Sequence, residues 1–190
     1  MIGYVTDTSR WERWKREYVF GAFYIFPPDD VIGQIDALRE IHDPTSASIC
    51  QAHVSLSEPV PRPLNAQDQQ ELRRILRKVD PFVVRYGPVR TFPPYPGVAL
   101  AISPEDPFQA LRSAIHEASA FDGVALRRES IAPHMTIAEF ISLDRTKELV
   151  GQLGSAAPVG EFTCDRVEYA VPDADFRFRR LLALPLGDSG

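Results

Sequence analysis

The sequence contains little cysteine and little histidine. Its 190 residues include two cysteines, Cys50 and Cys164, and four histidines. Two isolated cysteines form neither a C-x-x-C motif nor a disulfide framework, which is typical of a protein from a reducing compartment. Because histidine is so scarce, a pattern that contains two of the four is informative.

Long apolar runs are also missing. No stretch approaches the roughly 20 consecutive apolar residues that a membrane-spanning helix needs. Basic residues precede the apolar run at 18–26, as in a signal peptide, but Glu12 and Glu17 interrupt them. Pro-Pro-Asp-Asp at 27–30 stands where small residues should mark a cleavage site. We therefore expect a cytoplasmic protein with no membrane partner.

A net basic charge is absent as well. The chain has 21 Lys and Arg against 26 Asp and Glu, which gives a formal net charge of -5. Proteins that bind extended nucleic-acid duplexes normally present a basic face, so this class is disfavoured. A pocket for one phosphate is still compatible, since local charge can oppose the net sign. With 44% apolar residues, the chain is predicted to form one monomeric domain over residues 1–190.

A short motif occurs twice in this chain. Residues 52–58 read AHVSLSE and residues 133–139 read PHMTIAE, so the pattern His-apolar-Ser/Thr-apolar-small-Glu is repeated. On this composition, a given histidine is followed by apolar-Ser/Thr-apolar about one time in fifty. Two such matches among four histidines are therefore difficult to attribute to chance.

The motifs lie within a larger repeat. FYIFPPDD at 23–30 aligns with ALAISPED at 99–106, and each segment is followed by a helical pattern and then by a motif. This arrangement predicts two similar lobes, with the two motif strands (near 51–57 and 131–139) central. Expected strands are 18–26, 51–57, 82–92, 97–103, 131–140, 161–171 and 176–186. Expected helices begin at 29 or 30, 66, 104 and 143, and a loop is expected at 43–48.

Each motif predicts a strand face that carries a histidine and a hydroxyl side chain. Side chains at i and i+2 of a strand share a face, so His53 lies beside Ser55, and His134 beside Thr136. Two histidines can serve as general base and general acid near neutral pH. Two hydroxyls can donate to phosphate oxygens whose charge grows in the transition state. No set of metal ligands at suitable spacing accompanies them, so neither metal nor cofactor is expected.

A lone histidine on a strand is more often either exposed at the surface or buried with hydrogen-bond partners for its ring nitrogens. The duplication of the whole pattern favours a functional interpretation for His53 and His134. His42 and His116 lack a Ser/Thr partner and fall on predicted helices, so a structural role is expected for both. Ser55 is not expected to be a covalent nucleophile, because no G-x-S-x-G turn surrounds it.

The chain resembles the two-histidine phosphoesterase superfamily, the group of the bacterial 2′-5′ RNA ligases and RNA 2′,3′-cyclic phosphodiesterases. The resemblance rests on two H-x-[ST]-x motifs, His53-Val54-Ser55-Leu56 and His134-Met135-Thr136-Ile137, about eighty residues apart. It implies an α+β fold of two pseudo-symmetric lobes, each a small antiparallel sheet with covering helices, around a central cleft. It also implies metal-independent chemistry on cyclic phosphates or 2′-5′ bonds.

Further substrate contacts are predicted around the motifs. An arginine fork can hold a phosphate, and aromatic rings can stack on the bases of single-stranded RNA. The candidates are Arg127 and Arg128, just before the second motif, and Phe92 and Tyr95 in the TFPPYPG turn. Arg85 and Arg90 are weaker candidates. Trp11 and Trp14 are expected on a short helix that packs against a lobe.

Three functions are compatible with these residues. The first is a phosphodiesterase that opens a 2′,3′-cyclic phosphate of RNA or of a small nucleotide. The second is a 2′-5′ RNA ligase, which uses related chemistry in the other direction. The third is a module that binds phosphorylated or RNA ends without turnover. Two titratable groups favour an enzyme, because binding alone would not require them.

Overall fold

The structure is a computed structural model that describes residues 2–91, 96–127 and 131–187. Within these ranges, strands form two antiparallel four-stranded sheets, in the orders β2-β1-β7-β8 and β5-β4-β3-β6. We call these the first and the second sheet. The strands are β1 Ala22–Ile25, β2 Val54–Ser55, β3 Phe82–Thr91, β4 Gly97–Ser103, β5 His134–Glu139, β6 Gly160–Cys164, β7 Arg166–Pro172 and β8 Phe178–Pro185. The helices are η1 Arg13–Tyr18, α1 Asp29–His42, α2 Pro44–Ile49, α3 Ala66–Leu76, α4 Glu105–His116, η2 Ser119–Phe121 and α5 Leu143–Leu153.

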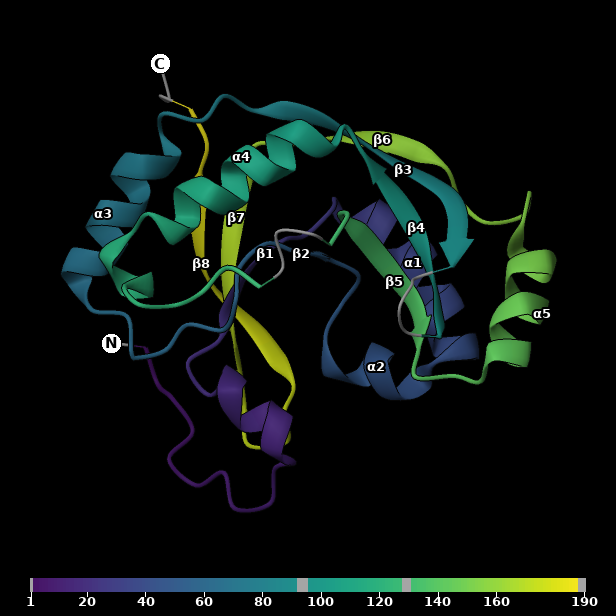
Figure 1. Cartoon of the computed structure of the whole chain (residues 1–190), viewed down its shortest axis with the longest axis horizontal. Helices are drawn as coiled ribbons and strands as arrows, with labels where there is room; N and C mark the ends of the chain where they lie inside the picture. The colour runs from purple at the N-terminus through teal and green to yellow at the C-terminus, as the bar shows by residue number, and fades with distance from the viewer. Residues whose placement is uncertain (1, 92–95, 128–130, 188–190) are drawn as a thin grey trace.

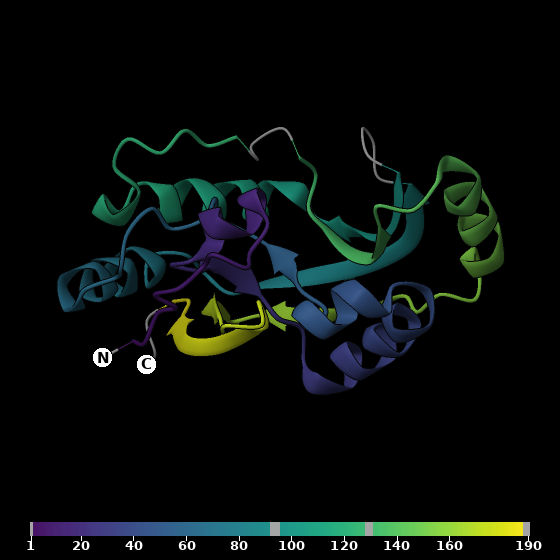
Figure 2. The same cartoon turned by 90° about the horizontal axis from the view of Figure 1, so that it is seen from below.

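The predicted α+β architecture of two lobes is confirmed. Helices α3 and α4 lie with the first sheet, and α1, α2 and α5 lie with the second (Figure 1). Each motif strand is an edge strand of its own sheet, and these two edges, β2 and β5, contact each other. The motif strands are therefore central in the molecule, although neither is central in a sheet. Figure 2 shows the same two halves from below.

The first helix of each repeat associates with the other repeat's motif strand. Helix α1, from the first repeat, packs against β5 of the second sheet. Helix α4, from the second repeat, is hydrogen-bonded to the strand that carries the first motif. This exchange couples the lobes, because each motif strand is supported by an element from the other half of the chain.

The prediction of one strand at 161–171 is wrong. The chain crosses from one sheet to the other at Asp165: β6 pairs with β3, where Phe82 lies opposite Cys164, and β7 pairs with β1, where Tyr24 lies opposite Glu168. Residues on both sides of Asp165 favour a strand, so local preference does not reveal the crossing. It is set by the sheet with which each half pairs.

The predicted loop at 43–48 is also wrong, because helix α2 occupies Pro44–Ile49. Asp43 caps it: the carboxylate accepts a hydrogen bond from the backbone N–H of Ser46 at 3.1 Å. Pro44 occupies the first turn, where its missing N–H costs nothing. A capping aspartate followed by proline is a helix start signal, and it explains the short helix.

The strand expected at 18–26 is shorter than predicted, with only Ala22–Ile25 in β1. Gly21 has a φ of 73° and ends the turn that follows η1, with its N–H donating to Tyr18. A Cβ at Gly21 would lie 2.2 Å from the carbonyl oxygen of Ala170. Glycine therefore permits both the positive φ and the close approach of β7.

The motif strands are anchored by their apolar faces. Val54 and Leu56 of the first motif and Met135 and Ile137 of the second are fully buried in the main core. Burying side chains of this size contributes about 1.5–3 kcal/mol each relative to exposure. The alternation fixes the opposite face of each strand as the one that carries the histidine and the hydroxyl.

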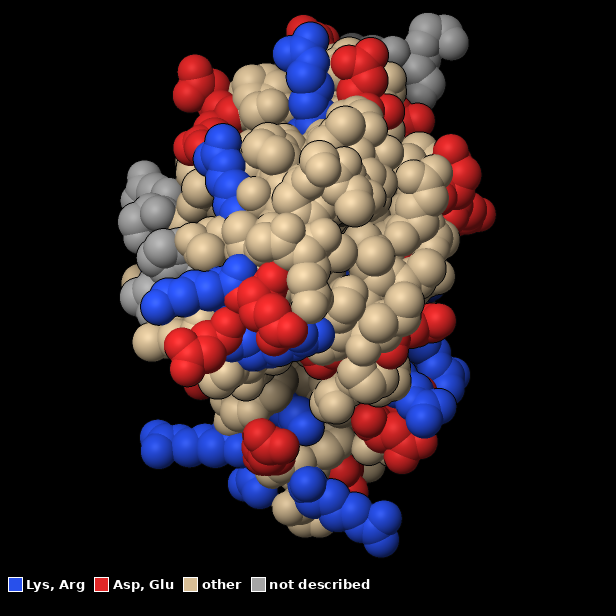
Figure 3. Space-filling model, turned by 90° about the vertical axis from the view of Figure 1, so that its right-hand side faces the viewer, with Lys and Arg blue, Asp and Glu red and all other residues tan. Residues whose placement is uncertain are grey.

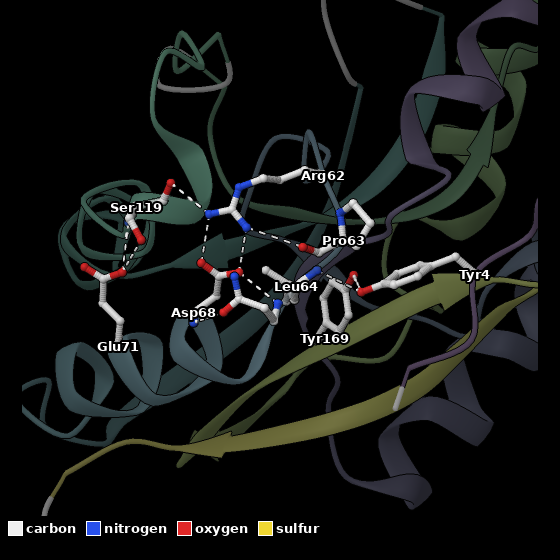
Figure 4. Close-up of polar contacts among 9 residues, drawn as sticks. Tyr4, Arg62, Pro63, Leu64, Asp68, Glu71, Ser119 and Tyr169 are labelled. Atoms are coloured by element: carbon white, nitrogen blue, oxygen red, sulfur yellow. Dashed lines mark hydrogen bonds and ion pairs between the residues drawn. The ribbon is translucent and has the colours of Figure 1, made fainter.

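The segment after the first motif is held by polar contacts (Figure 4). Arg62 donates two hydrogen bonds to the buried carboxylate of Asp68, at 2.6 and 2.8 Å. Asp68 also forms a capping box with Asn65 at the start of α3. The backbone N–H of Leu64 donates to the Tyr4 hydroxyl at 3.0 Å. These contacts join the segment after the motif to α3 and to the N-terminal stretch.

The face at the α5 end of the molecule shows acidic and basic side chains interspersed around a broad uncharged area (Figure 3). Within the described ranges, no helix has the length and apolar character needed to cross a membrane.

Candidate functional site

The first motif places His53 and Ser55 on one face beside β1. Both side chains are half-buried, whereas Val54 between them is fully buried, as the alternation predicts. Tyr24 of β1 lies opposite Ser55. Its ring packs edge-on against the imidazole of His53, with the centroids 4.8 Å apart. The imidazole of His53 is therefore packed on one side against the ring of Tyr24.

The second motif places His134 and Thr136 on one face of β5 in the same way. Both are half-buried, with the fully buried Met135 between them. Across the strand pair, Ala101 lies opposite His134, and Ala99 lies opposite Thr136. The neighbours are small here, so the two motifs differ in surroundings: aromatic beside the first and alanine beside the second.

The two imidazoles are oriented by equivalent hydrogen bonds. Nδ1 of His53 lies 2.6 Å from the carbonyl oxygen of Gln51, and Nδ1 of His134 lies 2.9 Å from that of Ala132. A carbonyl oxygen can only accept, so Nδ1 donates in both rings. In the neutral imidazole, Nε2 then carries the lone pair. Both rings are thus set in the tautomer whose Nε2 can act as a base, and in the protonated form Nε2 can donate.

Arg112 of α4 connects the segments that carry the two motifs. This side chain is 2% exposed, and its Nε donates to the carbonyl oxygen of Leu56 at 3.1 Å. Nη1 donates to the carbonyl oxygen of Ile131 at 3.2 Å, and Nη2 to that of Ser55 at 3.5 Å. A single guanidinium therefore bonds to the backbone of the first motif and to the residue three positions before His134.

The glutamates that end the motifs are held by the other repeat. The backbone N–H of Glu58 donates to Nε2 of His116, the last residue of α4, at 3.2 Å. The backbone N–H of Glu139 donates to the carboxylate of Asp43, the C-cap of α1, at 3.0 Å. Ser46 of α2 adds a hydroxyl donor to the Glu139 side chain at 3.3 Å. His116 therefore has the structural role that the sequence predicts, and burial lowers its pKa.

The protein is related in sequence to a known family. A model of the 2′-5′ RNA ligase superfamily matches residues 27–175, which include both motifs. The chain belongs to this superfamily. The resemblance that the two His-x-Ser/Thr motifs predict is confirmed.

Two curated relatives of this 2′-5′ RNA ligase superfamily member carry the phosphoesterase name. The chain is 27% identical over 132 residues to "Putative phosphoesterase OB1230" of Oceanobacillus iheyensis, which covers 68% of this chain and 75% of the relative. It is 29% identical over 147 residues to "Putative phosphoesterase Bcer98_0945" of Bacillus cytotoxicus, covering 75% and 82%. These relatives and the superfamily support an enzyme of the phosphoesterase class.

Solved structures share the fold. The structure of E. coli LigT in its apo form gives a TM-score of 0.59 at 16% identity, covering 88% of this chain and 96% of LigT. LigT complexed with 3′-AMP gives 0.56 at the same identity and coverage. The protein TT0787 of Thermus thermophilus gives 0.56 at 14% identity, covering 89% and 98%. At such identities the similarity shows a common fold.

Three of the other predicted substrate contacts, Phe92, Tyr95 and Arg128, lie outside the described ranges. Arg127 is exposed and lies near two carboxylates, 3.6 Å from Glu17 and 3.7 Å from Glu58. Arg85, a weaker candidate, lies 3.5 Å from Glu161, and both side chains are largely exposed. Arg127 is thus already neutralised in part, so its assignment to the substrate stays a prediction.

The N-terminal tryptophans pack against the first lobe, as the sequence predicts, but only Trp14 lies on the short helix η1, and Trp11 precedes it. Trp11 is buried, and its indole Nε1 donates to the carbonyl oxygen of Ala174 at 3.0 Å. Trp11 and Trp14 both meet the ring of Phe176 edge-on, at 5.1 and 5.4 Å. Phe176 lies in the β7–β8 connection, and its ring centroid lies 5.3 Å from that of Phe178 of β8. The Phe178 ring in turn lies 5.7 Å from the Tyr24 ring. A series of contacting aromatic rings therefore runs from the N-terminal segment to Tyr24, which packs against His53.

Residues near the first motif that the sequence did not single out are Phe26, Glu168 and Arg180. Arg180 lies with its guanidinium carbon 5.1 Å from the centroid of the Phe26 ring. The Phe26 ring lies 5.9 Å from that of His53. The alternation of Phe178 and Arg180 in FRFRR is a signal that these two residues share a strand face, although it does not show which face.

Metal ligation is the remaining question for the site. Among the residues that the structure describes, no group of three or more His, Cys, Asp or Glu side chains is arranged to hold a metal ion. The two cysteines are buried and unpaired with each other, and burial raises the pKa of each thiol to about 12. Neither thiol is therefore prepared to act as a thiolate ligand or nucleophile.

Proposed function

We propose that this protein is a metal-independent phosphodiesterase that hydrolyses the 2′,3′-cyclic phosphate of an RNA end or a small nucleotide. The observation that carries the proposal is the matched setting of His53 and His134. Each ring has its Nδ1 bonded to a backbone carbonyl two residues earlier, and each has a hydroxyl two residues later on the same strand face. Two equivalent acid–base groups are what an in-line displacement at phosphorus requires.

In this mechanism, one neutral imidazole accepts a proton from water at Nε2. The water oxygen bonds to phosphorus, and the bond from phosphorus to one ribose oxygen breaks. The other imidazole, protonated, donates its Nε2 proton to that departing oxygen. The hydroxyls of Ser55 and Thr136 donate to the non-bridging oxygens as their charge increases. One proton has then passed from water to the leaving group, and the histidine pair has exchanged its protonation states.

Ligation is the second candidate, and the superfamily match favours it. A ribose hydroxyl would replace water as the nucleophile, and the same two histidines would transfer the same protons. LigT, which shares this fold, forms complexes with 3′-AMP and with phosphate, so the fold accommodates a nucleotide monophosphate. That observation supports a nucleotide or RNA-end substrate for this chain.

The test is a turnover assay on purified protein with the four nucleoside 2′,3′-cyclic phosphates, and with adenosine 3′,5′-cyclic phosphate as a control. We expect hydrolysis of the 2′,3′-cyclic compounds to a single nucleoside monophosphate, with little turnover of the control. The rate should survive EDTA, because the proposed steps use only side chains. Binding without turnover, or activity lost to EDTA and restored by a divalent ion, would contradict the proposal.

A further inference from the structure

One face of the first sheet extends the candidate site beyond the motifs. Tyr24 lies opposite Ser55 on one side and opposite Glu168 on the other. Ala22 lies opposite Ala170, which in turn lies opposite Arg180. Because opposite residues and residues two apart share a face, these side chains line the same face as His53. This face runs across four strands, from β2 to β8.

Arg180 is fixed in position on this face. Its Nε lies 3.0 Å from the carboxylate of Glu168, a side chain only 7% exposed, while the Arg180 side chain is 34% exposed. The guanidinium lies 5.1 Å from the centroid of the Phe26 ring, within cation–π distance. A buried carboxylate and an aromatic ring thus orient a cation that is still partly open to solvent. Such preorganisation lowers the cost of ordering the side chain when a ligand binds.

Glu168 belongs to a cluster of four charged side chains. Its Oε2 is 3.0 Å from Arg180, and its Oε1 is 3.4 Å from Arg166, which also lies 3.5 Å from Asp165. Two carboxylates therefore face two arginines. Arg180 differs from Arg166 in that its guanidinium also lies over the Phe26 ring, beside the first motif.

Two ring contacts connect Arg180 to the first motif. The centroid of the Phe26 ring lies 5.1 Å from the guanidinium carbon of Arg180 and 5.9 Å from the centroid of the His53 imidazole, so Phe26 contacts both groups. Tyr24 packs against the same imidazole, at 4.8 Å. A ligand whose cyclic phosphate lies at the histidines could therefore place a second anion, one ribose away, at Arg180.

We propose that Arg180 binds a second phosphate of the substrate, the one attached to the 5′ oxygen of the nucleotide whose 2′,3′-cyclic phosphate is opened. This inference rests on the proposed function. Guanidinium groups bind phosphate through paired, charge-assisted hydrogen bonds, and a 5′-phosphate is the nearest anion to a cyclic phosphate in a nucleotide chain. The favoured substrate is then a 5′-phosphorylated nucleotide or the end of an oligonucleotide. A nucleoside cyclic phosphate alone would leave Arg180 unused.

Binding tests this assignment independently of turnover. Calorimetric titration should show that adenosine 3′,5′-bisphosphate binds about tenfold or more tightly than adenosine 3′-monophosphate, as expected for hydrogen bonds to a charged group. Arg180→Gln should abolish this difference and leave the affinity for the 3′-monophosphate unchanged. The matched control is Arg179→Gln, which removes the adjacent arginine, exposed and paired with Asp173 at 2.9 Å. The control should keep the wild-type difference.

Kinetics then distinguish the two sources of the second phosphate. Substrates are adenosine 2′,3′-cyclic phosphate, its 5′-phosphorylated form, and a dinucleotide that ends in the cyclic phosphate. We expect higher kcat/KM for both longer substrates, with the advantage lost in Arg180→Gln. A gain for the 5′-phosphorylated form alone would identify a terminal phosphate, and a gain for both would include the phosphodiester of an RNA end.

The proposal and the proposed function fail separately. If wild-type protein binds the bisphosphate and the monophosphate equally, the role of Arg180 is wrong, whatever the turnover assay shows. This wild-type comparison needs no variant, so an unstable Arg180→Gln protein would not prevent it. If the bisphosphate binds more tightly in an Arg180-dependent way but no cyclic phosphate is hydrolysed, the second phosphate site stands and the hydrolase assignment fails.

Discussion

Arg112 donates a hydrogen bond from Nε to the backbone carbonyl of Leu56, 3.1 Å away, in the segment that carries the first motif. Another nitrogen of the same guanidinium bonds to Ile131, just before the second motif. The two histidines come from opposite halves of the chain, and catalysis would require them to keep a constant separation. A buried, branched donor that bonds to both backbones supplies that constraint. Its position on α4 is the consequence of the helix exchange between the repeats.

Replacing Arg112 with methionine should reduce both stability and turnover. The substitution keeps an unbranched apolar chain but leaves the carbonyls of Leu56 and Ile131 without this donor. Each buried carbonyl left unpaired costs about 1–3 kcal/mol, which urea denaturation would measure. Arg112→Lys retains one donor and should fall between the two proteins. A variant that folds with wild-type stability would show that water replaces these hydrogen bonds.

Replacing either motif histidine should stop most of the hydrolysis. His53→Ala and His134→Ala should each lower kcat by about 100-fold or more, the range for losing one acid or base. The pH–rate profile of the parent should be bell-shaped, with apparent values that belong to the pair. The readout is initial velocity on a 2′,3′-cyclic nucleotide, with His42→Ala, outside the motifs, as the control. A His53→Ala protein with parental activity would favour the binding-module hypothesis.

Removing the motif hydroxyls should have a smaller effect than removing the histidines. Ser55→Ala and Thr136→Val each remove one of several donors to the phosphate, so we expect a loss of up to about 10–100-fold in kcat/KM. Inhibition by the nucleoside monophosphate product should weaken in parallel, because the same hydroxyls would donate to its phosphate oxygens. If the double variant keeps both the kcat/KM and the inhibition constant of the parent, the two hydroxyls do not bind the phosphate.

Local sequence signals predict the helices and strands whose ends are set by residues within the element or next to it. Helix α5 has the expected bounds, because Ser142 caps it by accepting a hydrogen bond from Arg145 and its apolar residues recur at helical spacing. Strand β4 likewise follows the predicted range. The crossing at Asp165 is not predictable in this way. It depends on which sheet each flanking strand joins, a contact between distant parts of the chain.

The same limit applies to the candidate site. The i, i+2 rule places His53 with Ser55 and His134 with Thr136 from sequence alone, since each pair lies within one strand. Arg180 belongs to the same face only because β1 and β7 lie between β2 and β8. No local pattern encodes that strand order. The structure therefore supplies the candidate contact that lies farthest from the motifs in sequence.

His116 should make the protein less stable in mildly acidic solution. Burial lowers its pKa in the folded state, so the unfolded chain takes up a proton first as the pH falls below about 6.5. Stability is full above that pH and decreases toward the lowered folded pKa. His116→Gln, which cannot titrate, should show a flatter dependence of the free energy of unfolding between pH 7 and 5. His42→Gln is the matched control, and an equal flattening there would refute the assignment.

Asp68 should contribute to a second loss of stability at lower pH. The hydrogen bonds from Arg62 are the largest cause of the lowered pKa of this carboxyl, followed in the same direction by the backbone at Asn65 and the charge of Arg62, against the effect of burial. A depressed folded pKa means that the contribution is present above the unfolded value of about 3.9 and disappears as the pH falls through the folded value. Asp68→Asn removes the charge but keeps the size of the side chain.

The variant Asp68→Asn should therefore be less stable than the parent at pH 7, by about 1–2 kcal/mol, because the half-exposed Arg62 loses its carboxylate and the capping box with Asn65 is altered. The difference between the two proteins should shrink as the pH is lowered below 4, since the parent then loses the same charge. Urea denaturation at pH 7, 5 and 3 measures both statements. A difference that stays constant across this range would show that the charge of Asp68 does not stabilise the fold.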